Sequence, residues 1–379
     1  MIEKKKILIF IDWYLPGFRA GGPVTSCAGL VEHLAGEFDF FIFCRNTDYT
    51  RSIPYSEITP NCWVKKGDGV HVYYVSKDQL RVTTLRSIFS QIKPDFIYLN
   101  SLFSFWFTLV PLLLLRGRQA KVILAARGML APSALAIKRF KKTIFLLNAR
   151  LFGLFNKVVF QASSASERED IRVVFSNNEI QIAPNLPRKK EQLIAMAQSA
   201  PLDGLRLVNI ARIAPEKNLL GALTILKAIR AKVNFEFYGP VYNQSYWSKC
   251  QAEIASLPAN ITVKYQGAIE PKDIPAVLSQ HHFLFMPTRG ENFGHIIYES
   301  LNCGTPVIIS DRTPWKDLKN QGAGWDIPLE NQHQFIEAIE SYATMSAKEY
   351  EQLHATARQT ALEFMNKSDA VVLNKALFL

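Results

Sequence analysis

Cysteine is scarce in this sequence and is not arranged for metal binding or disulfide pairing. The 379 residues include five cysteines, which are scattered along the chain and contain no CxxC pair. An odd number of widely spaced cysteines is typical of a protein kept in a reducing compartment. We therefore expect a cytoplasmic protein with no disulfide framework and no cysteine-ligated zinc.

Long apolar runs are also missing. The longest apolar tract, residues 102–115 (LFSFWFTLVPLLLL), contains Pro111. At about 1.5 Å per residue a helix of this length spans roughly 20 Å, which is shorter than the hydrocarbon core of a bilayer. The tract predicts a buried or interfacial helix and argues against a transmembrane span.

Negative charge is sparse in the first half of the chain. Residues 1–190 hold 27 Lys and Arg against 14 Asp and Glu, whereas residues 191–379 hold 17 against 19. The whole surplus of the +11 net charge therefore lies in the first half. A surplus placed in this way predicts an anionic partner for that half, which leaves nucleic acid, an anionic membrane and a phosphorylated substrate open.

Short apolar segments alternate with helical patterns along both halves of the chain. Segments such as residues 7–11, 121–125 and 205–210 are typical of parallel strands that are buried on both faces. Prolines and basic residues interrupt the alternation at 184–204, where we place a linker. The pattern predicts an α/β fold of two Rossmann-like, doubly wound domains, residues 1–190 and 200–365, which face a cleft. Ligands of such sheets bind outside the carboxyl ends of the strands.

Two cations follow the first strand of the second half. Arg212 and Lys217 lie in the segment NIARIAPEKN, which leads into a helix. A planar guanidinium and a compact ammonium near a helix N-terminus suit a diphosphate group. The alternative is a solvated Arg212 and a Lys217 that pairs with Glu216.

A second constellation lies in Arg289–Ser310, RGENFGHIIYESLNCGTPVIIS. Glu291 precedes an expected helix and Glu299 lies within it, with seven residues between them. Free amides at the helix start favour phosphate, and Gly294 allows a close approach of backbone to ligand. Glu299 is expected to accept hydrogen bonds from a diol. An amphipathic helix with a capping carboxylate and one paired glutamate is the alternative. Proton transfer is not expected of His295, which we interpret as a pocket-lining residue.

With these residues the second half resembles the C-terminal domain of retaining GT-B glycosyltransferases of family 4, the glycosyl transferases group 1 family. That family has a strand ending in Gly/Ala-Arg, a lysine five residues later, the pattern E-x-F-G-x4-E, and a following strand that begins C/A-G-x-P-V. This sequence carries Ala211-Arg212, Lys217, Glu291-Asn-Phe-Gly-His-Ile-Ile-Tyr-Glu299 and Cys303-Gly-Thr-Pro-Val307. The resemblance covers about residues 205–310.

The resemblance implies a role for each matching residue. Arg212 and Lys217 would hold the donor diphosphate and, with Glu291, are the expected catalytic residues. Glu291 would contact the donor sugar and Glu299 the nucleotide ribose. The further donor-binding residues would be Asn292, Phe293, Gly294, His295, Gly239, Gly267 and Ala268.

The first half resembles the family less closely. Its glycine-rich loop, PGFRAGGP, provides Gly21, Gly22 and Arg19 as expected contacts for a phosphate or an acceptor, although a tight turn between strand and helix explains the glycines equally well. Arg127 stands where many members of the family have a histidine. Since arginine is not a base near neutral pH, we expect an electrostatic or acceptor-binding role for it. Asn100 and Ser101 are further candidate acceptor contacts. In related enzymes the tail packs back on the N-terminal domain, and we expect this of residues 366–379.

A basic amphipathic helix is predicted at residues 131–152. Phe140, Ile144, Leu147 and Leu151 form one apolar stripe, and the cations on the opposite side are Lys138, Arg139, Lys141 and Lys142. Such a helix docks on anionic lipid, or packs its apolar stripe on the sheet with a solvated basic face. Aromatic residues are not interleaved with these cations, so we do not expect nucleic-acid binding.

The resulting hypothesis is a retaining glycosyltransferase that moves a sugar from a nucleoside-diphosphate sugar to a polysaccharide or lipid-linked glycan. It would work in the cytoplasm, including the cytoplasmic face of the inner membrane. No cofactor or metal is expected, because no D-x-D pair follows a strand. The alternatives are another GT-B activity, such as a sugar-nucleotide epimerase or a phosphorylase, and a non-catalytic nucleotide-sugar-binding protein.

Overall fold

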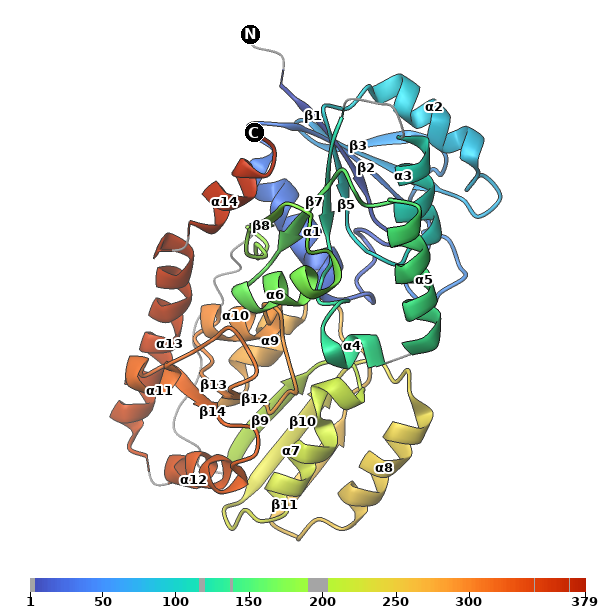
Figure 1. Cartoon of the computed structure of the whole chain (residues 1–379). Helices are drawn as coiled ribbons and strands as arrows, with labels where there is room; N and C mark the ends of the chain where they lie inside the picture. The colour runs from blue at the N-terminus through green and yellow to red at the C-terminus, as the bar shows by residue number, and fades with distance from the viewer. Residues whose placement is uncertain (1–3, 116–119, 137–138, 190–203, 344, 368) are drawn as a thin grey trace. The chain divides into compact units, whose positions relative to one another are not determined.

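The computed structural model describes residues 4–115, 120–136, 139–189, 204–343, 345–367 and 369–379. The chain forms two compact units, Met1–Lys189 with Asp369–Leu379, and Lys190–Ser368 (Figure 1). Each unit is a sheet with helices on both faces. This is the α/β architecture of two Rossmann-like units that the alternating pattern predicts.

The sheet of the first unit has the order β3-β4-β2-β1-β5-β6-β7-β8, and only the β3–β4 pair is antiparallel. Its strands are β1 (Lys6–Phe10), β2 (Asp39–Arg45), β3 (Trp63–Gly67), β4 (Val70–Val75), β5 (Phe96–Leu99), β6 (Lys121–Ala125), β7 (Val158–Ala162) and β8 (Ile180–Ile182). Its helices are α1 (Gly22–Leu34), α2 (Val82–Ile92), the π-helical turn η1 (Phe105–Leu109), α3 (Val110–Leu114), α4 (Pro132–Ala136), α5 (Arg139–Leu151), α6 (Ala165–Val174) and α14 (Ala370–Ala376).

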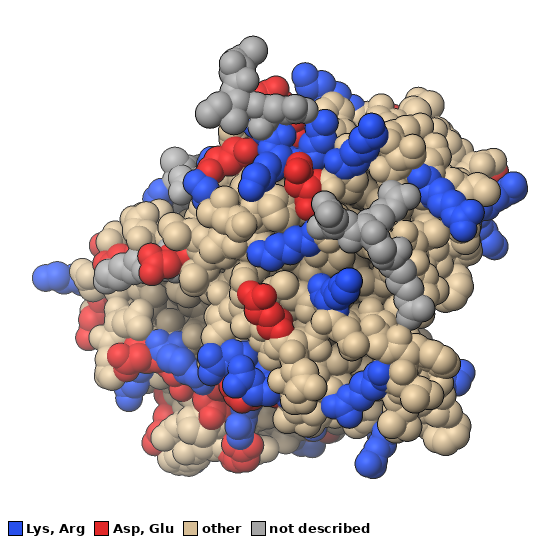
Figure 2. Space-filling model, turned by 45° about the horizontal axis from the view of Figure 1, so that its top comes forward, with Lys and Arg blue, Asp and Glu red and all other residues tan. Residues whose placement is uncertain are grey.

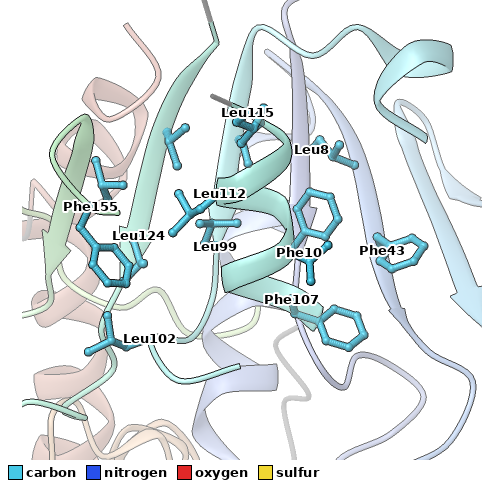
Figure 3. Packing of buried hydrophobic residues seen from close by; sticks show 14 of the residues in the cluster. Leu8, Phe10, Phe43, Leu99, Leu102, Phe107, Leu112, Leu115, Leu124 and Phe155 are labelled. Atoms are coloured by element: carbon cyan, nitrogen blue, oxygen red, sulfur yellow. The ribbon is translucent and has the colours of Figure 1, made fainter. Parts of the chain in front are cut away.

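Alternating side chains of β1 supply two separate cores, as the period of two in a strand requires. Leu8 and Phe10 face the core beneath α2, α3 and α5, and Ile7 and Ile9 face the core beneath α1 and α14. All four are fully buried. Figure 3 shows Phe107 and Leu112 packed next to Phe10 and Leu99 in the first of these cores.

The apolar tract 102–115 lies in this core as η1 and α3. A search of the described residues finds no helix that is both long and apolar enough to cross a membrane. The last helix, α14, lies beside α1, and its neighbour Phe378 packs on Phe38 and Phe96 (Figure 1).

The sheet of the second unit is fully parallel and has the order β11-β10-β9-β12-β13-β14. Its strands are β9 (Leu205–Ile210), β10 (Val233–Tyr238), β11 (Ile261–Tyr265), β12 (Phe283–Met286), β13 (Val307–Ser310) and β14 (Gly324–Ile327). Its helices are the 3₁₀ turn η2 (Pro215–Lys217), α7 (Leu219–Leu226), α8 (Gln244–Ala255), α9 (Ile274–Ser279), α10 (His295–Asn302), α11 (Leu318–Gln321), α12 (Gln332–Ala343) and α13 (Ala347–Lys367).

The strand order of this second sheet reverses between β9 and β12, which are adjacent although two strands separate them in sequence. This is the Rossmann order, and its ligands bind outside the carboxyl ends of the strands where the order reverses. A ligand site is therefore expected at the loops that follow β9 and β12.

Three differences from the sequence prediction concern elements rather than the fold. Strands β3, β8 and β14 were not expected from the pattern. The helix predicted at 131–152 is present as α4 and α5, and Lys138 lies outside the described residues. The predicted apolar stripe of α5 does not pack on the sheet, because the helix buries a different face, with Ala149 at its centre.

Candidate functional site

The loops after β9 and β12 meet through an ion pair. The Lys217 ammonium lies 2.5 Å from the Glu291 carboxylate, and both side chains are largely buried. Lys217 ends the 3₁₀ turn η2 after β9, and Glu291 follows β12. The structure thus brings together two of the three residues expected to be catalytic, although they are 74 positions apart.

Backbone contacts hold the two loops in register. The amide of Arg289 and the hydroxyl of Thr288 both donate to the carbonyl of Glu216, at 2.9 and 3.1 Å. The side-chain amide of Asn218 donates to the carbonyl of Pro287 at 2.9 Å. The position of Lys217 relative to Glu291 is therefore fixed by the loops as well as by charge.

Arg212 has a carboxylate partner in the structure, whereas the sequence alternative left it solvated. That alternative paired Glu216 with Lys217, whereas the structure pairs Glu216 with Arg212 at 3.2 Å. The Arg212–Glu216 pair is 41% and 44% exposed, so solvent screens it and it contributes little to stability. Because the pair is weak and accessible, Arg212 can exchange Glu216 for an anionic ligand.

Aromatic side chains pack against the start of α10. The indole of Trp315 donates to the carbonyl of Phe293 at 2.7 Å, and the Phe293 ring packs on Trp315 and Phe364. Gly294 precedes α10 with φ 77°, a left-handed conformation that favours glycine. His295 lies 4.7 Å from the Phe293 ring, measured between ring centroids, and is half-buried. These contacts orient the first amides of α10.

Glu299 and Asn292 flank this helix start. Asn292 is half-buried in the loop, and Glu299 is half-buried on the second turn of α10. Burial, together with the nearby Glu299 carboxylate, raises the pKa of the Cys303 thiol to about 11. Cys303 is therefore a neutral, buried thiol and not a nucleophile at neutral pH.

Gly239 and Gly267 complete this edge of the sheet on the β10 and β11 side. A Cβ atom on Gly239 would lie 1.8 Å from the carbonyl oxygen of Ala211, so the chain after β10 touches the chain that carries Arg212. The amide of Gly239 donates to the carbonyl of Gly267 at 2.7 Å, and the Tyr265 hydroxyl donates to the Gly239 carbonyl. Ala268, next to Gly267, is exposed.

In the first unit, the glycine-rich loop and Arg127 are linked through Asn100. Gly21 precedes α1 with φ 72°, Gly22 begins this helix, and a Cβ on Gly21 would meet no atom within 4 Å. The backbone amide of Arg19 donates to Asp48. Asn100 donates to the carbonyl of Pro23 at 3.1 Å and accepts from Arg127 at 2.6 Å.

Arg127 itself is engaged by a network that the sequence did not reveal. Its guanidinium donates to Asn100, to Asn185 and to the hydroxyl of Tyr98. Burial raises the pKa of Tyr98 to about 12, and its hydroxyl donates to Gln161, which in turn donates to Asn374 of α14. Each of the three guanidinium nitrogens thus has a protein acceptor, which gives Arg127 a positioning role within this unit.

In the sequence, this network is indicated by Gln161, a polar residue within the otherwise apolar strand VVFQA. A buried polar side chain in a parallel strand requires hydrogen-bond partners. Those partners, Tyr98, Ala183 and Asn374, come from other parts of the sequence. In the described part of the chain, no cluster of three His, Cys, Asp or Glu side chains could hold a metal ion.

Comparison with protein families adds the deciding observation. Residues 192–360, which make up most of the second unit, match the family described as "Glycosyl transferases group 1". Over these residues the chain is similar to glycosyltransferases. The residues matched by the family contain Arg212, Lys217, Glu291 and Glu299.

Solved structures of this glycosyltransferase fold cover nearly the whole chain. Sucrose-phosphate synthase from Thermosynechococcus elongatus is 15% identical, with a TM-score of 0.70 over 99% of this chain and 98% of that one. Anabaena Alr3699/HepE in complex with UDP-glucose is 15% identical, with a TM-score of 0.67 over 98% of both chains. These likenesses show the GT-B fold.

A curated relative is also similar to this chain. It is an uncharacterized 41.2 kDa protein in the cps region of Klebsiella pneumoniae, 21% identical over 242 residues. The alignment covers 62% of this chain and 64% of that protein. The chain therefore matches slightly less than two thirds of the relative's length.

Proposed function

We propose that this chain is a glycosyltransferase of family 4 that takes its sugar from a nucleoside-diphosphate sugar and retains the configuration of the anomeric carbon. The observation that carries the proposal is the Lys217–Glu291 pair, where the loops after β9 and β12 meet. A cation and a carboxylate held together are the two groups needed to bind a diphosphate beside a polyhydroxylated ring.

Each part of the donor has a matching group in the proposed site. Lys217 and Arg212 supply positive charge for the diphosphate, and Glu291 accepts hydrogen bonds from sugar hydroxyls. Gly267 leaves room for the nucleoside, since a Cβ there would meet no atom within 4 Å, and Gly239 lets the chain after β10 approach the chain that carries Arg212. Glu299 is the acceptor for the ribose hydroxyls. The complex of Anabaena Alr3699/HepE with UDP-glucose, a protein of the same fold, supports this class of donor.

The proposed chemistry follows from the charges. The bond between the anomeric carbon and the diphosphate breaks as the acceptor hydroxyl attacks from the same face. Negative charge then develops on the departing diphosphate, where Lys217 and Arg212 stabilise it. No protein nucleophile is assigned, and no metal or cofactor is part of the proposal.

We place the acceptor among polysaccharide or lipid-linked glycans. Two similar proteins support this class: the curated relative lies in a cps region, and WaaG, of the same fold, is a glycosyltransferase involved in lipopolysaccharide biosynthesis. The positive surplus of residues 1–190 suits a phosphorylated acceptor. A cytoplasmic location remains a prediction from the cysteine pattern.

A thermal-shift panel of nucleoside diphosphates and their sugars tests the donor. A ligand present at about 100 times its dissociation constant stabilises the folded protein by about 2.7 kcal/mol, which gives a clear rise in melting temperature. We expect one base to stand out. If none of the nucleotides shifts the melting temperature, the proposed donor class is wrong.

The reaction itself is tested with the selected donor and a panel of glycan acceptors. We expect a glycoside whose anomeric proton coupling matches the donor, which indicates retention. An inverted product contradicts the retaining mechanism alone. Formation of an isomerised nucleotide sugar or of a sugar phosphate identifies instead the epimerase or phosphorylase alternative.

A further inference from the structure

Helix α5 of the first unit is apolar on two opposite faces. One face packs into the core through Phe145, Leu146 and Ala149. The other carries Phe140, Ile144, Leu147 and Leu151, which we call the α5 stripe. At about 100° per residue these four side chains lie within an arc of about 60°, centred opposite Ala149.

The α5 stripe is exposed along its whole length. Its side chains are 78%, 44%, 60% and 79% exposed in chain order, and Phe152, just after the helix, is 66% exposed. These five residues are among fourteen exposed large apolar side chains in the described part of the chain. More than a third of them thus lie within 13 consecutive residues, and such a concentration marks an interaction surface.

Cations flank the stripe without interrupting it. Arg139 and Arg150 lie about 90–110° to one side of the centre of the stripe and Lys141 about 90° to the other, and all three are exposed. Lys142 points inward instead, where its ammonium donates to the carbonyl of Ala134 at 2.6 Å and lies over the Phe103 ring. Long basic side chains beside an apolar stripe are placed to reach phosphate groups while the stripe is buried.

The surrounding sequence is free of acidic residues. Residues 96–166 contain ten Lys and Arg and no Asp or Glu. Helix α5 itself carries Arg139, Lys141, Lys142 and Arg150 and no acidic residue, so the occupant of the α5 stripe meets a positively charged helix. This argues against a second copy of the chain, because two identical faces would bring like charges together.

Charge alone does not define the surface. Figure 2 shows one face of the structure, on which Lys and Arg side chains lie in several groups and not in one continuous patch. The feature that distinguishes α5 is the combination of an exposed apolar stripe with exposed flanking cations. Nucleic acid would use the cations but not an aliphatic stripe.

We propose that the α5 stripe docks the glycosyltransferase on an anionic lipid surface, with the helix lying in the plane of the headgroups. Phe140, Leu147 and Leu151 insert at the boundary of the acyl chains, and Arg139 and Lys141 contact lipid phosphates. The 13-residue helix is roughly 20 Å long, which suits an interfacial position and not a span. The proposal does not depend on the donor, since lipid binding is measured without substrate.

Vesicle co-sedimentation of the full chain tests the surface. Phosphatidylcholine vesicles with and without phosphatidylglycerol are compared for four proteins: the wild type, a stripe variant (F140S/L147S/L151S), a flank variant (R139Q/K141Q) and a control (V372S/L373S). The control residues are exposed apolar side chains of α14, on the opposite face of the sheet. All the replaced side chains are exposed, so the variants should melt like the wild type.

We expect the wild type and the control to sediment with anionic vesicles and to remain in solution with neutral ones. The stripe variant should lose on the order of tenfold in partitioning, because binding strength follows the buried apolar area. The flank variant should lose about fivefold for each cation and the wild type should be released by salt. Donor-induced thermal shifts should be equal in all four proteins.

Three results would overturn the proposal. If the stripe variant sediments with anionic vesicles like the wild type, the α5 stripe is not the membrane contact. Equal loss in the control and stripe variants would show that exposed apolar area in general, and not α5, drives binding. Absence of vesicle binding combined with a concentration-dependent dimer in sedimentation velocity, broken by the stripe variant, would assign the surface to a second copy.

Discussion

Replacing Gly239 by alanine is expected to damage the donor site through the backbone alone. Gly239 has φ 145°, and its missing Cβ faces the carbonyl oxygen of Ala211 at 1.8 Å and the amide nitrogen of Arg212 at 3.2 Å. A methyl group cannot be accommodated at 1.8 Å, so the chain after β10 must move away from the chain after β9. This separation would also displace Arg212, which lies on the chain after β9.

The magnitude combines two effects. A residue other than glycine in this region of φ costs about 1–3 kcal/mol. Forced movement of packed backbone adds about 1–3 kcal/mol, as in overpacked cores. Gly239→Ala should therefore lower the free energy of unfolding of the second unit by about 2–6 kcal/mol, a large share of the stability of a typical domain.

Two other glycines of the same unit separate these effects. Gly267 has φ 78° and its Cβ would meet nothing within 4 Å, so Gly267→Ala carries the backbone cost alone, about 1–2 kcal/mol. Gly290 has neither a positive φ nor a clash, and Gly290→Ala should change stability by less than about 1 kcal/mol. Urea unfolding followed by circular dichroism measures all three variants. If Gly239→Ala unfolds at the same urea concentration as Gly290→Ala, the reasoning from close approach is wrong.

Two further predictions concern buried polar groups. Burial lowers the pKa of His282 to about 3 and of His354 to about 4, so the unfolded chain binds more protons below its own histidine pKa of 6.5. The free energy of unfolding should be constant above pH 6.5 and fall by about 1.4 kcal/mol per histidine for each pH unit from there towards pH 4. Urea unfolding at several pH values measures this dependence. If the free energy of unfolding of His354→Gln changes with pH as steeply as that of the wild type, the prediction is wrong. Arg127→Leu should cost about 2–5 kcal/mol because it leaves buried acceptors without a donor, whereas Arg139→Leu on the surface should cost less than about 0.5 kcal/mol in the same assay. Equal costs for the two arginines would show that the Arg127 network is not what holds this part of the first unit.

Local patterns indicated where the candidate residues of the second unit lie, because these residues belong to short segments next to strands. Ala211 and Lys217 lie in the segment after β9, Glu291 lies in the loop after β12 and Glu299 lies on the helix α10 that follows. Parallel strands bring their carboxyl ends to one edge of the sheet. The pairing of Lys217 with Glu291 was not predicted, because it depends on β9 and β12 being neighbours.

In the first unit, local sequence patterns do not determine which side chains are buried or which are paired. Helix α5 has apolar side chains on two faces, so its periodicity does not tell which face is buried, and the packing of Ala149 against the core decides it. The partners of Arg127 are likewise set by tertiary structure, since Tyr98, Asn100 and Asn185 lie 29, 27 and 58 positions away from it in sequence.

Calorimetric titration of the selected nucleoside diphosphate into wild type and Lys217→Ala tests the central claim most directly. Lys227→Ala is the matched control, because Lys227 lies in the same unit and also has a glutamate partner, Glu253 at 3.7 Å. Loss of a charge-assisted contact of about 1.5–3 kcal/mol predicts a dissociation constant raised by roughly 10- to 150-fold in Lys217→Ala and unchanged within about twofold in Lys227→Ala. Equal affinity of Lys217→Ala and wild type, with both proteins folded, would contradict a donor site at the loops after β9 and β12.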